Sequence, residues 1–445
     1  MCKILTCVLA CFAINAGIAL SAQISTRWTL DACMRYAVEH SPQTAIQYAQ
    51  LEIAKESYKN AIAKLLPSLN ASTSANFNFG RSVDPETNIY MDINSFNNSY
   101  GISSSLTLFD GFTSINNVRM QYASREMSKY QTQYQRDMVA YATMEAFLKV
   151  QYYNEMVDLV KQQLNTSMYN LHQTERMLEL GLKGVPDLAE MQAKESSDRY
   201  QLVRQQNLLA IAAIRLKEQM NFPVDELLEI ESYIMPEDTI FTVLTTDELY
   251  EQALRTLPQV QAIKRTLDME KFSYAATRGA IYPELTVSGG WNTGFSRRIG
   301  ELYDVFKEQF KNRRGFYISV NLNIPIFDGF YRLGNVRYSK QQFFIAQKTH
   351  DADLRILYKN IDEAVTDLNG QIELCTLAQR QSNAAELAHR VNERKYYEGL
   401  ISTLELHTSA NRMLEAQMTV ANEQLTYFLK YKMVAYYRGE PFIND

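Results

Sequence analysis

The tetrapeptide Phe-Asp-Gly-Phe occurs twice in this chain, at residues 109–112 and again at 327–330, about 218 positions later. In both copies a run of alternating apolar and polar residues precedes it, and a very long segment rich in helix-forming residues follows it. Further matches keep the same spacing: Arg176 with Arg394, Gly181 with Gly399, and Leu188 with Leu406. A repeat of this length predicts that one strand–turn–helix unit occurs twice and accounts for nearly the whole mature chain.

The N-terminal residues 1–22 have the features of a secretory signal peptide. Lys3 is the only charged residue of this segment, residues 4–20 are mostly apolar, and small residues before Gln23 offer a cleavage site. Lipoprotein processing at Cys11 is a less favoured alternative, because the apolar region continues past it. We expect the first repeat at 23–246 and the second at 247–445.

Composition excludes several classes of protein. The formal net charge of −5 argues against a nucleic-acid partner. Beyond the N-terminal segment no apolar run reaches the length of about 18 residues that a transmembrane helix needs. Loss of the signal peptide leaves Cys33 and Cys375, which are too far apart in sequence to indicate a disulfide framework or a metal cluster; their role does not follow from the sequence.

Four segments alternate with the period of two that is typical of β-strands, at about 68–79, 99–109, 284–293 and 316–327. Apolar residues occupy one set of positions, and Asn, Ser, Thr and Gly occupy the other. This pattern fits a lipid-facing outer surface and a wet lumen. A half-buried sheet of a soluble domain alternates as well, but its solvent face would carry Lys and Glu, which are nearly absent here. We interpret residues 80–98 as a polar loop.

The segments after each Asp-Gly are predicted to be exceptionally long helices. Residues 113–180 contain no Gly or Pro, and a helix of that length would run roughly 100 Å. Residues 331–398 are about as long, and their apolar residues also recur at spacings of three and four, which favours coiled-coil packing. Gly-containing turns after each helix predict helical hairpins at about 113–220 and 331–438. The segments 221–246 and 439–445 are expected to pack around the middle of these helices.

Four strands cannot close a membrane barrel, because the smallest barrels have about eight. An open sheet would leave unpaired edges in lipid, which the bilayer does not tolerate. We therefore expect other copies of the chain to complete the sheet in a closed ring. Three copies would give about twelve strands and a helical tube below them, although closure alone does not decide between a dimer, a trimer and a tetramer.

The chain resembles the TolC-type outer-membrane efflux factors over essentially its whole mature length. The resemblance rests on the order and duplication of short motifs: the doubled Phe-Asp-Gly, the Pro near each repeat start, and the hairpin tips. It implies a mainly α fold with a trimeric twelve-stranded membrane β-barrel, a long α-helical barrel and an equatorial domain. It also implies export through the outer membrane, with the protein extending into the periplasm. The implied partners are a periplasmic adaptor (a membrane fusion protein) and an inner-membrane transporter.

The resemblance assigns roles to residues at the hairpin tips and at the strand-to-helix turns. Asp187, Tyr396 and Glu405 match positions that narrow or close the periplasmic aperture in relatives. Ile401 and Thr408 depart from the family pattern there, so closure is expected to use different contacts. The other assigned positions are the adaptor-docking residues Arg176, Gly181, Leu182, Arg394, Gly399 and Leu400, and the turn residues Asp110, Gly111, Asp328 and Gly329.

The sequence supports neither catalysis nor a cofactor. The five histidines lie in separate helical segments without metal-ligand spacing, and no phosphate-binding glycine loop or nucleophile elbow is present. An outer-membrane efflux conduit is therefore the favoured function. A secreted or surface-attached coiled-coil adhesin or spacer is the alternative, and a diffusion porin leaves the long helices unexplained.

Overall fold

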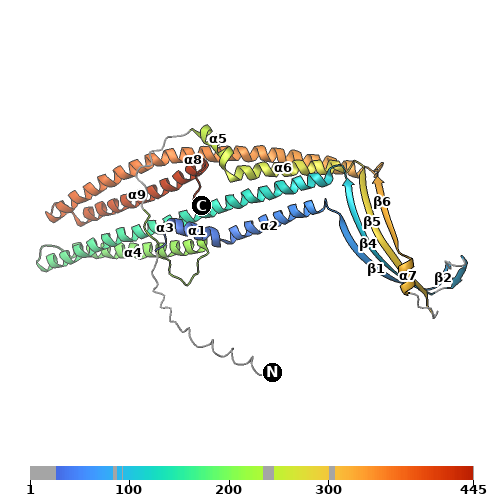
Figure 1. Ribbon diagram of the computed structural model, residues 1–445. Helices are drawn as coiled ribbons and strands as arrows, with labels where there is room; N and C mark the ends of the chain where they lie inside the picture. The colour runs from blue at the N-terminus through green and yellow to red at the C-terminus, as the bar shows by residue number, and fades with distance from the viewer. Residues whose placement is uncertain (1–26, 84–87, 93, 234–244, 300–305, 444–445) are drawn as a thin grey trace, which may run out of the picture. The chain divides into compact units, whose positions relative to one another are not determined.

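The computed structural model describes residues 27–83, 88–92, 94–233, 245–299 and 306–443, so the predicted signal peptide lies outside the described residues. Figure 1 shows the described chain as long helices and a sheet of long strands. The elements of the first half are α1 (Leu30–His40), α2 (Pro42–Ala63), β1 (Ser68–Asn78), β2 (Arg81–Val83), β3 (Tyr90–Asp92), β4 (Ser95–Phe109), α3 (Thr113–Glu179) and α4 (Val185–Met220). Those of the second half are α5 (Thr246–Thr256), α6 (Pro258–Gly279), β5 (Glu284–Arg298), α7 (Phe306–Asn312), β6 (Gly315–Asn323), α8 (Tyr331–Tyr397) and α9 (Thr403–Tyr437).

The chain forms two compact units. The first comprises the chain up to Ala37, Ala142–Thr239 and Ala384–Ala421, and therefore holds most of α1, both hairpin turns and α4. The second comprises Val38–Tyr141, Ile240–Asn383 and the residues from Asn422 onward, and therefore holds the sheet. The helices α3, α8 and α9 each contribute to both units. None of the helices in the described residues is both long and apolar enough to cross a membrane.

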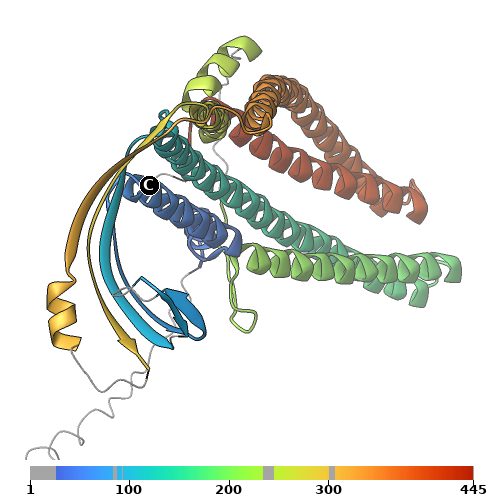
Figure 2. The same cartoon turned by 90° about the vertical axis from the view of Figure 1, so that its right-hand side faces the viewer.

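The main sheet is antiparallel, with the strand order β1-β4-β5-β6, and the four strands curve together in Figure 2. Its register brings the alternating apolar positions of neighbouring strands together: Leu285 lies opposite Leu322, Val287 opposite Val320, and Leu106 opposite Val287. Because side chains alternate between the faces, one face is mainly apolar and the other carries mainly Asn, Ser and Thr. The register thus gives the sheet two chemically distinct faces.

The strand region also differs from the sequence prediction. Residues 80–98 are not a plain loop, because β2 and β3 pair within them and β4 already begins at Ser95. The strand β5 runs on to Arg298, and the short helix α7 follows it. Alternation weakens at these strand ends, where Asn, Gly and Arg replace the apolar residues, so the pattern alone does not reveal the extensions.

The helix α8 carries a regular seam of inward-facing residues, spaced alternately four and three apart as coiled-coil packing requires. Its buried or half-buried members run from Leu357 and Ile361 through Ala364, Leu368, Gln371, Cys375, Ala378, Ser382, Ala385 and His389 to Tyr396. In the second unit the apolar part of this seam packs in one cluster with Leu249, Leu257 and Val434. Beyond Leu368 the seam becomes small and polar, which reduces the apolar area available to hold the hairpin together.

Each Phe-Asp-Gly-Phe forms a tight turn between a strand and a long helix. Gly111 and Gly329 have φ of +66° and +68°, and the phenylalanine after each also has a positive φ. The carboxylate of Asp110 accepts hydrogen bonds from the amide (2.8 Å) and the hydroxyl (2.5 Å) of Ser114. The carboxylate of Asp328 accepts one from the amide of Arg332 (3.1 Å). Both aspartates therefore cap the helix that follows, which explains why Asp-Gly is found at both positions.

Candidate functional site at the hairpin tips

The two hairpin turns end their first helices in the same way. The amide of Leu182 donates a hydrogen bond to the carbonyl of Met177, and the amide of Leu400 donates one to the carbonyl of Lys395. The donor–acceptor distance is 2.9 Å in both. Gly181 and Gly399 adopt φ of +73° and +75°, the left-handed conformation that this C-cap requires. A methyl group at either glycine would meet no atom within 4 Å. The backbone conformation, and not crowding within the chain, thus requires glycine at both turns.

The turns also present apolar side chains to solvent. Leu182 is 70% exposed and Leu400 is 67% exposed. We define the tip patch by the five apolar residues that are exposed at the two turns: Leu180, Leu182, Val185, Leu400 and Leu404. Apolar residues clustered on the surface commonly mark a site of protein association.

Asp187 connects the two hairpins. Its carboxylate accepts a hydrogen bond from the amide of Gly184 (3.0 Å), which caps α4, and lies 3.8 Å from the ammonium of Lys183. It also accepts a bond of 3.4 Å from the hydroxyl of Thr403, at the start of α9. Thr403 is the buried residue that brings the second hairpin to this carboxylate. Ile401, which departs from the family pattern, is partly buried against Met191, Tyr396 and Leu406.

The other predicted tip residues have different surroundings. Tyr396 is buried, its ring lies 5.0 Å from the ammonium of Lys183, and its hydroxyl has no hydrogen-bond partner among the described residues. Asp187 therefore bonds Thr403 rather than Tyr396 in this chain. Glu405 and Arg394 are exposed, and Arg176 makes an exposed ion pair with Glu179.

A buried polar cluster lies further along the hairpins, and sequence reasoning missed it. The ammonium of Lys194 contacts the Asp198 carboxylate at 2.6 Å and the side-chain oxygen of Asn411 at 2.7 Å. The hydroxyl of Ser167 donates to the other carboxylate oxygen of Asp198. The side chains of Lys194 and Asp198 are only 7% and 5% exposed. Because Asn411 belongs to α9, this cluster ties the first hairpin to the second.

Two histidines of the second hairpin lie in the same region. Burial, and secondarily the nearby Lys194 ammonium, lower the pKa of His407 to about 4, and its Nε2 lies 3.3 Å from the Met191 sulfur. Burial also lowers the pKa of His389, whose Nδ1 lies 3.0 Å from the Ser409 hydroxyl. Both are therefore neutral at pH 7. The position of Lys194 and Asp198 in the buried seam of α4, three and seven residues after Met191, was the available sequence signal.

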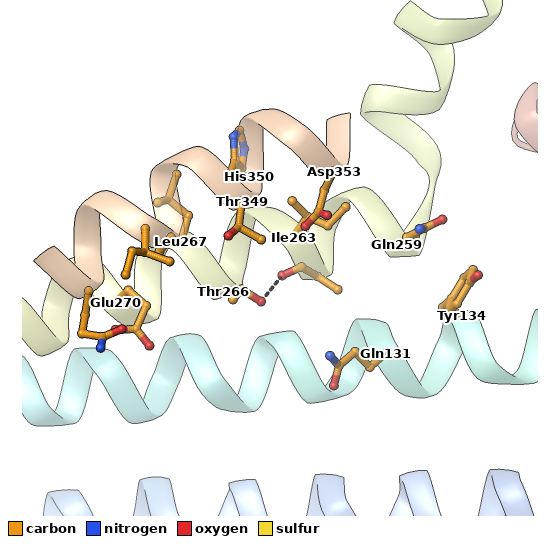
Figure 3. Close-up of a pocket in the computed structure, with 14 residues that line it drawn as sticks. Gln131, Tyr134, Gln259, Ile263, Thr266, Leu267, Glu270, Thr349, His350 and Asp353 are labelled. Atoms are coloured by element: carbon orange, nitrogen blue, oxygen red, sulfur yellow. Dashed lines mark hydrogen bonds between the residues drawn. The ribbon is translucent and has the colours of Figure 1, made fainter. Parts of the chain in front are cut away.

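A cavity of about 450 Å³ in the second unit is lined by α3, α6 and α8, and Figure 3 shows side chains that line it. Its polar side chains include Glu270, His350 and Asp353, while Ile263 and Leu267 supply apolar surface. His350 lies beside Asp351, with 3.6 Å between Nδ1 and a carboxylate oxygen. Within the described part of the chain no group of three side chains is suited to hold a metal ion.

The family model for outer membrane efflux proteins matches residues 34–221 and 249–428, which is most of the chain. The chain belongs to the outer membrane efflux protein family. This efflux protein is 21% identical to the outer membrane protein TolC of Vibrio cholerae, over 92% of this chain and 91% of that one. It is also 21% identical to the pyoverdine export outer membrane protein OpmQ of Pseudomonas aeruginosa, over 87% and 80% of the two chains.

Solved structures support the same fold. The Campylobacter jejuni CmeC outer membrane channel superposes with a TM-score of 0.80 at 17% identity, over 94% of this chain and 87% of that one. The outer membrane protein VceC of Vibrio cholerae superposes with a TM-score of 0.80 at 15% identity, over 93% and 96%. The solved structures show that this chain has the same fold. The family membership and the relatives show an outer-membrane efflux channel of the kind that works in tripartite systems, and not an enzyme. They remove the alternative of a secreted adhesin or spacer.

Proposed function

We propose that three copies of this efflux channel assemble into a closed twelve-stranded barrel continued by a helical tube. The observation that supports this is the four-stranded sheet itself: β1 and β6 are both edges, and one face is mainly apolar on each of the four strands. Lipid cannot satisfy the backbone groups of an unpaired edge. Pairing β1 of one copy with β6 of the next satisfies both edges by a single repeated contact, and three copies give a closed ring of workable size.

Disulfide cross-linking across that contact tests the proposal. Ser72→Cys in β1 and Ser319→Cys in β6 both lie on the polar face near the middle of their strands, in a protein whose native Cys33 and Cys375 are changed to Ser. Oxidation in outer membranes should give a ladder of disulfide-linked oligomers that ends at the trimer. A matched control places the second cysteine on β4 at Ser103, which already pairs with β1 at Asn70 within one copy; it should give no ladder. A ladder that ends at a dimer or a tetramer contradicts the trimer.

The tip patch is proposed as the docking surface for a periplasmic adaptor, which connects the channel to an inner-membrane transporter. Five apolar side chains exposed at two matching turns support this role. Gly181→Trp and Gly399→Trp should reduce adaptor recovery from detergent-solubilised envelopes at least about tenfold, because hot-spot contacts contribute about 2 kcal/mol or more. Gly80→Trp is the control, since its φ of +109° is also positive and a methyl group there also meets no atom within 4 Å, but it follows β1, far from both turns in the sequence. Unchanged recovery with the tip variants would show that the docking assignment is wrong.

The contacts between the hairpins are proposed to hold the periplasmic aperture closed. Asp187–Thr403 and Lys194–Asn411 both join the first hairpin to the second, so the hairpins can move apart only after these bonds break. Tyr396 and Glu405 are assigned to the aperture with them. Single-channel conductance in planar bilayers tests this assignment: Thr403→Val combined with Asn411→Leu should raise the open fraction. Thr408→Val, which removes only a bond to Leu404 within α9, should not.

A further inference from the structure

The helix α7 packs on the apolar face of the sheet. Its Phe310 ring lies 5.5 Å from the ring of Tyr100 and 6.0 Å from that of Trp291, and Phe306 lies 5.3 Å from Phe295. Tyr100 and Trp291 occupy the face that also carries Leu106 and Val287, as the register shows. Thr293 and Phe295, on the same face, are 5% and 7% exposed beneath the helix. In the proposed barrel, α7 therefore takes the place of lipid at this level.

Hydrogen bonds fix α7 where β6 no longer covers β5. Asn292 is the last residue of β5 that pairs with β6, opposite Gly315, so the backbone of β5 beyond it lacks a strand on that side. The side-chain amide of Gln309 replaces the strand: its oxygen accepts from the amide of Ser296 at 2.9 Å, and its nitrogen donates to the Ser296 carbonyl at 3.0 Å. The hydroxyl of Thr293 also donates to the carbonyl of Phe310 at 2.7 Å. The helix is thus a built part of the sheet.

The level of α7 follows from the length of β5. This strand has 15 residues and starts at Glu284, next to the end of α6. A tilted strand needs about 9 to 11 residues to cross a membrane. The aromatic cluster around Trp291 and Phe310 therefore lies where the strand leaves the hydrocarbon on the side away from the helices, the level at which barrels carry an aromatic girdle.

Cationic side chains surround that level. Lys307 and Lys311 follow the two sheet-facing phenylalanines of α7, so they share one side of the helix, and both are exposed. Arg313 and Arg314, just before β6, are exposed as well, as is Arg297 at the end of β5. The segment 297–314 has six basic and three acidic residues, although the chain as a whole is acidic. An excess of cations just above an aromatic girdle matches the position of lipid phosphates.

We propose that α7 and its flanking cations form a binding site for the phosphate groups of the outer-leaflet glycolipid, lipid A, on the outer wall of the barrel. Phe306 and Phe310 anchor the helix to the sheet, Gln309 completes the edge of β5, and Lys307, Lys311, Arg313 and Arg314 contact the phosphates. The site rests on the proposed function, because this face meets lipid only in a closed barrel.

Binding of fluorescent bisphosphorylated lipid A to the purified, delipidated oligomer in detergent tests the site. The variant carries Lys307→Gln, Lys311→Gln, Arg313→Gln and Arg314→Gln. Its affinity should fall at least about tenfold, because the four side chains that attract the anionic phosphates lose their positive charge. The matched control removes two lysines and two arginines that are exposed on α8: Arg337→Gln, Lys340→Gln, Lys359→Gln and Arg380→Gln. It should bind as the unchanged protein does.

Two further measurements use the unchanged protein, so that they hold even if the variant fails to fold. Removal of both phosphates from lipid A should weaken binding as much as the variant does, and raising the salt concentration should weaken it progressively. Equal binding of phosphate-free lipid A, equal binding by the variant, or equal affinity for phosphatidylglycerol micelles would overturn the site. Failure of the unchanged protein to form an oligomer before lipid is added would instead contradict the proposed barrel.

Discussion

The two Phe-Asp-Gly-Phe turns have the same sequence and the same backbone conformation, but their surroundings differ. A methyl group on Gly111 would lie 2.1 Å from the carbonyl oxygen of Gly279, whereas one on Gly329 would meet nothing within 4 Å. The hydroxyl of Thr113 also bonds the carbonyl of Ala276 next to the first turn. Local sequence thus sets the shape of both turns, while packing against α6 makes the first far less tolerant of change.

The buried seams of the two hairpins also differ, here because matching positions carry different residues. Applying the repeat offset, Ser167 and Asp198 of the first hairpin correspond to Ala385 and Ala416 of the second. The first hairpin therefore holds a buried carboxylate where the second holds a methyl group. The carboxylate binds Lys194, whose ammonium reaches Asn411 on the second hairpin. The repeat has diverged at the point where its two copies contact each other.

Asp198→Ala, which copies the second hairpin into the first, should have the largest effect on stability. It leaves the Lys194 ammonium buried without its carboxylate, and breaking a buried pair in this way costs about 3–5 kcal/mol. Amide hydrogen exchange in α4 should accelerate strongly. Adding Lys194→Met to Asp198→Ala should recover much of the lost stability, because no charge is then buried. Unchanged amide exchange in Asp198→Ala alone would contradict the comparison of the seams.

Gly111→Ala and Gly329→Ala measure how differently the two turns are packed. Both variants place an L side chain at a positive φ, which costs about 1–2 kcal/mol. Gly111→Ala must also displace the backbone of Gly279, so its total loss should reach about 2–5 kcal/mol. Thermal unfolding of the detergent-solubilised oligomer should show the larger decrease for Gly111→Ala. Equal decreases in the unfolding temperature of the two variants would mean that the backbone of α6 shifts at the first turn with little loss of stability.

The capping aspartates offer a smaller comparison of the same turns. Asp110→Ala removes two hydrogen bonds to Ser114, and loss of a helix cap costs about 0.5–2 kcal/mol. Asp328→Ala removes one bond to the Arg332 amide and a half-exposed ion pair, so its loss should lie at the lower end of that range. Urea titrations of the two variants measure the difference. A larger loss for Asp328→Ala would reverse the ranking of the turns.

Near neutral pH the pH dependence of the hairpin contact should be the smallest effect, because it develops only as the pH falls below about 6.5. The folded-state pKa of His407 is about 4, below the ordinary value of 6.5, because the ring is buried near the Lys194 ammonium. Between these values the unfolded chain binds more protons than the folded one, so His407 lowers stability as the pH falls from 6.5 toward 4. In His407→Gln, the stability measured by amide hydrogen exchange should depend less on pH over this window. A slope that persists in the variant would assign it to other groups.

Much of the fold could be predicted from sequence, because two periodicities and their duplication are local properties. Alternation with a period of two located all four strands of the main sheet, and the long segments free of Pro located α3 and α8. The extensions of β4 and β5 and the helix α7 were not predicted, because Asn, Gly and Arg at these strand ends carry no clear period. The tip glycines and Asp187 were identified by motif, but their hydrogen-bond partners were not.

The sequence by itself determined the duplicated strand–turn–helix unit, the membership of an outer-membrane efflux family, and the left-handed turns at its glycines, since each depends on residues close together in the chain. Only the tertiary structure decided that Asp187 bonds Thr403, that Lys194 reaches Asn411, and that Gln309 completes the edge of β5. In the first two pairs the residues lie more than 200 positions apart, and in all three the bond depends on the register of the packed elements, which no local pattern encodes.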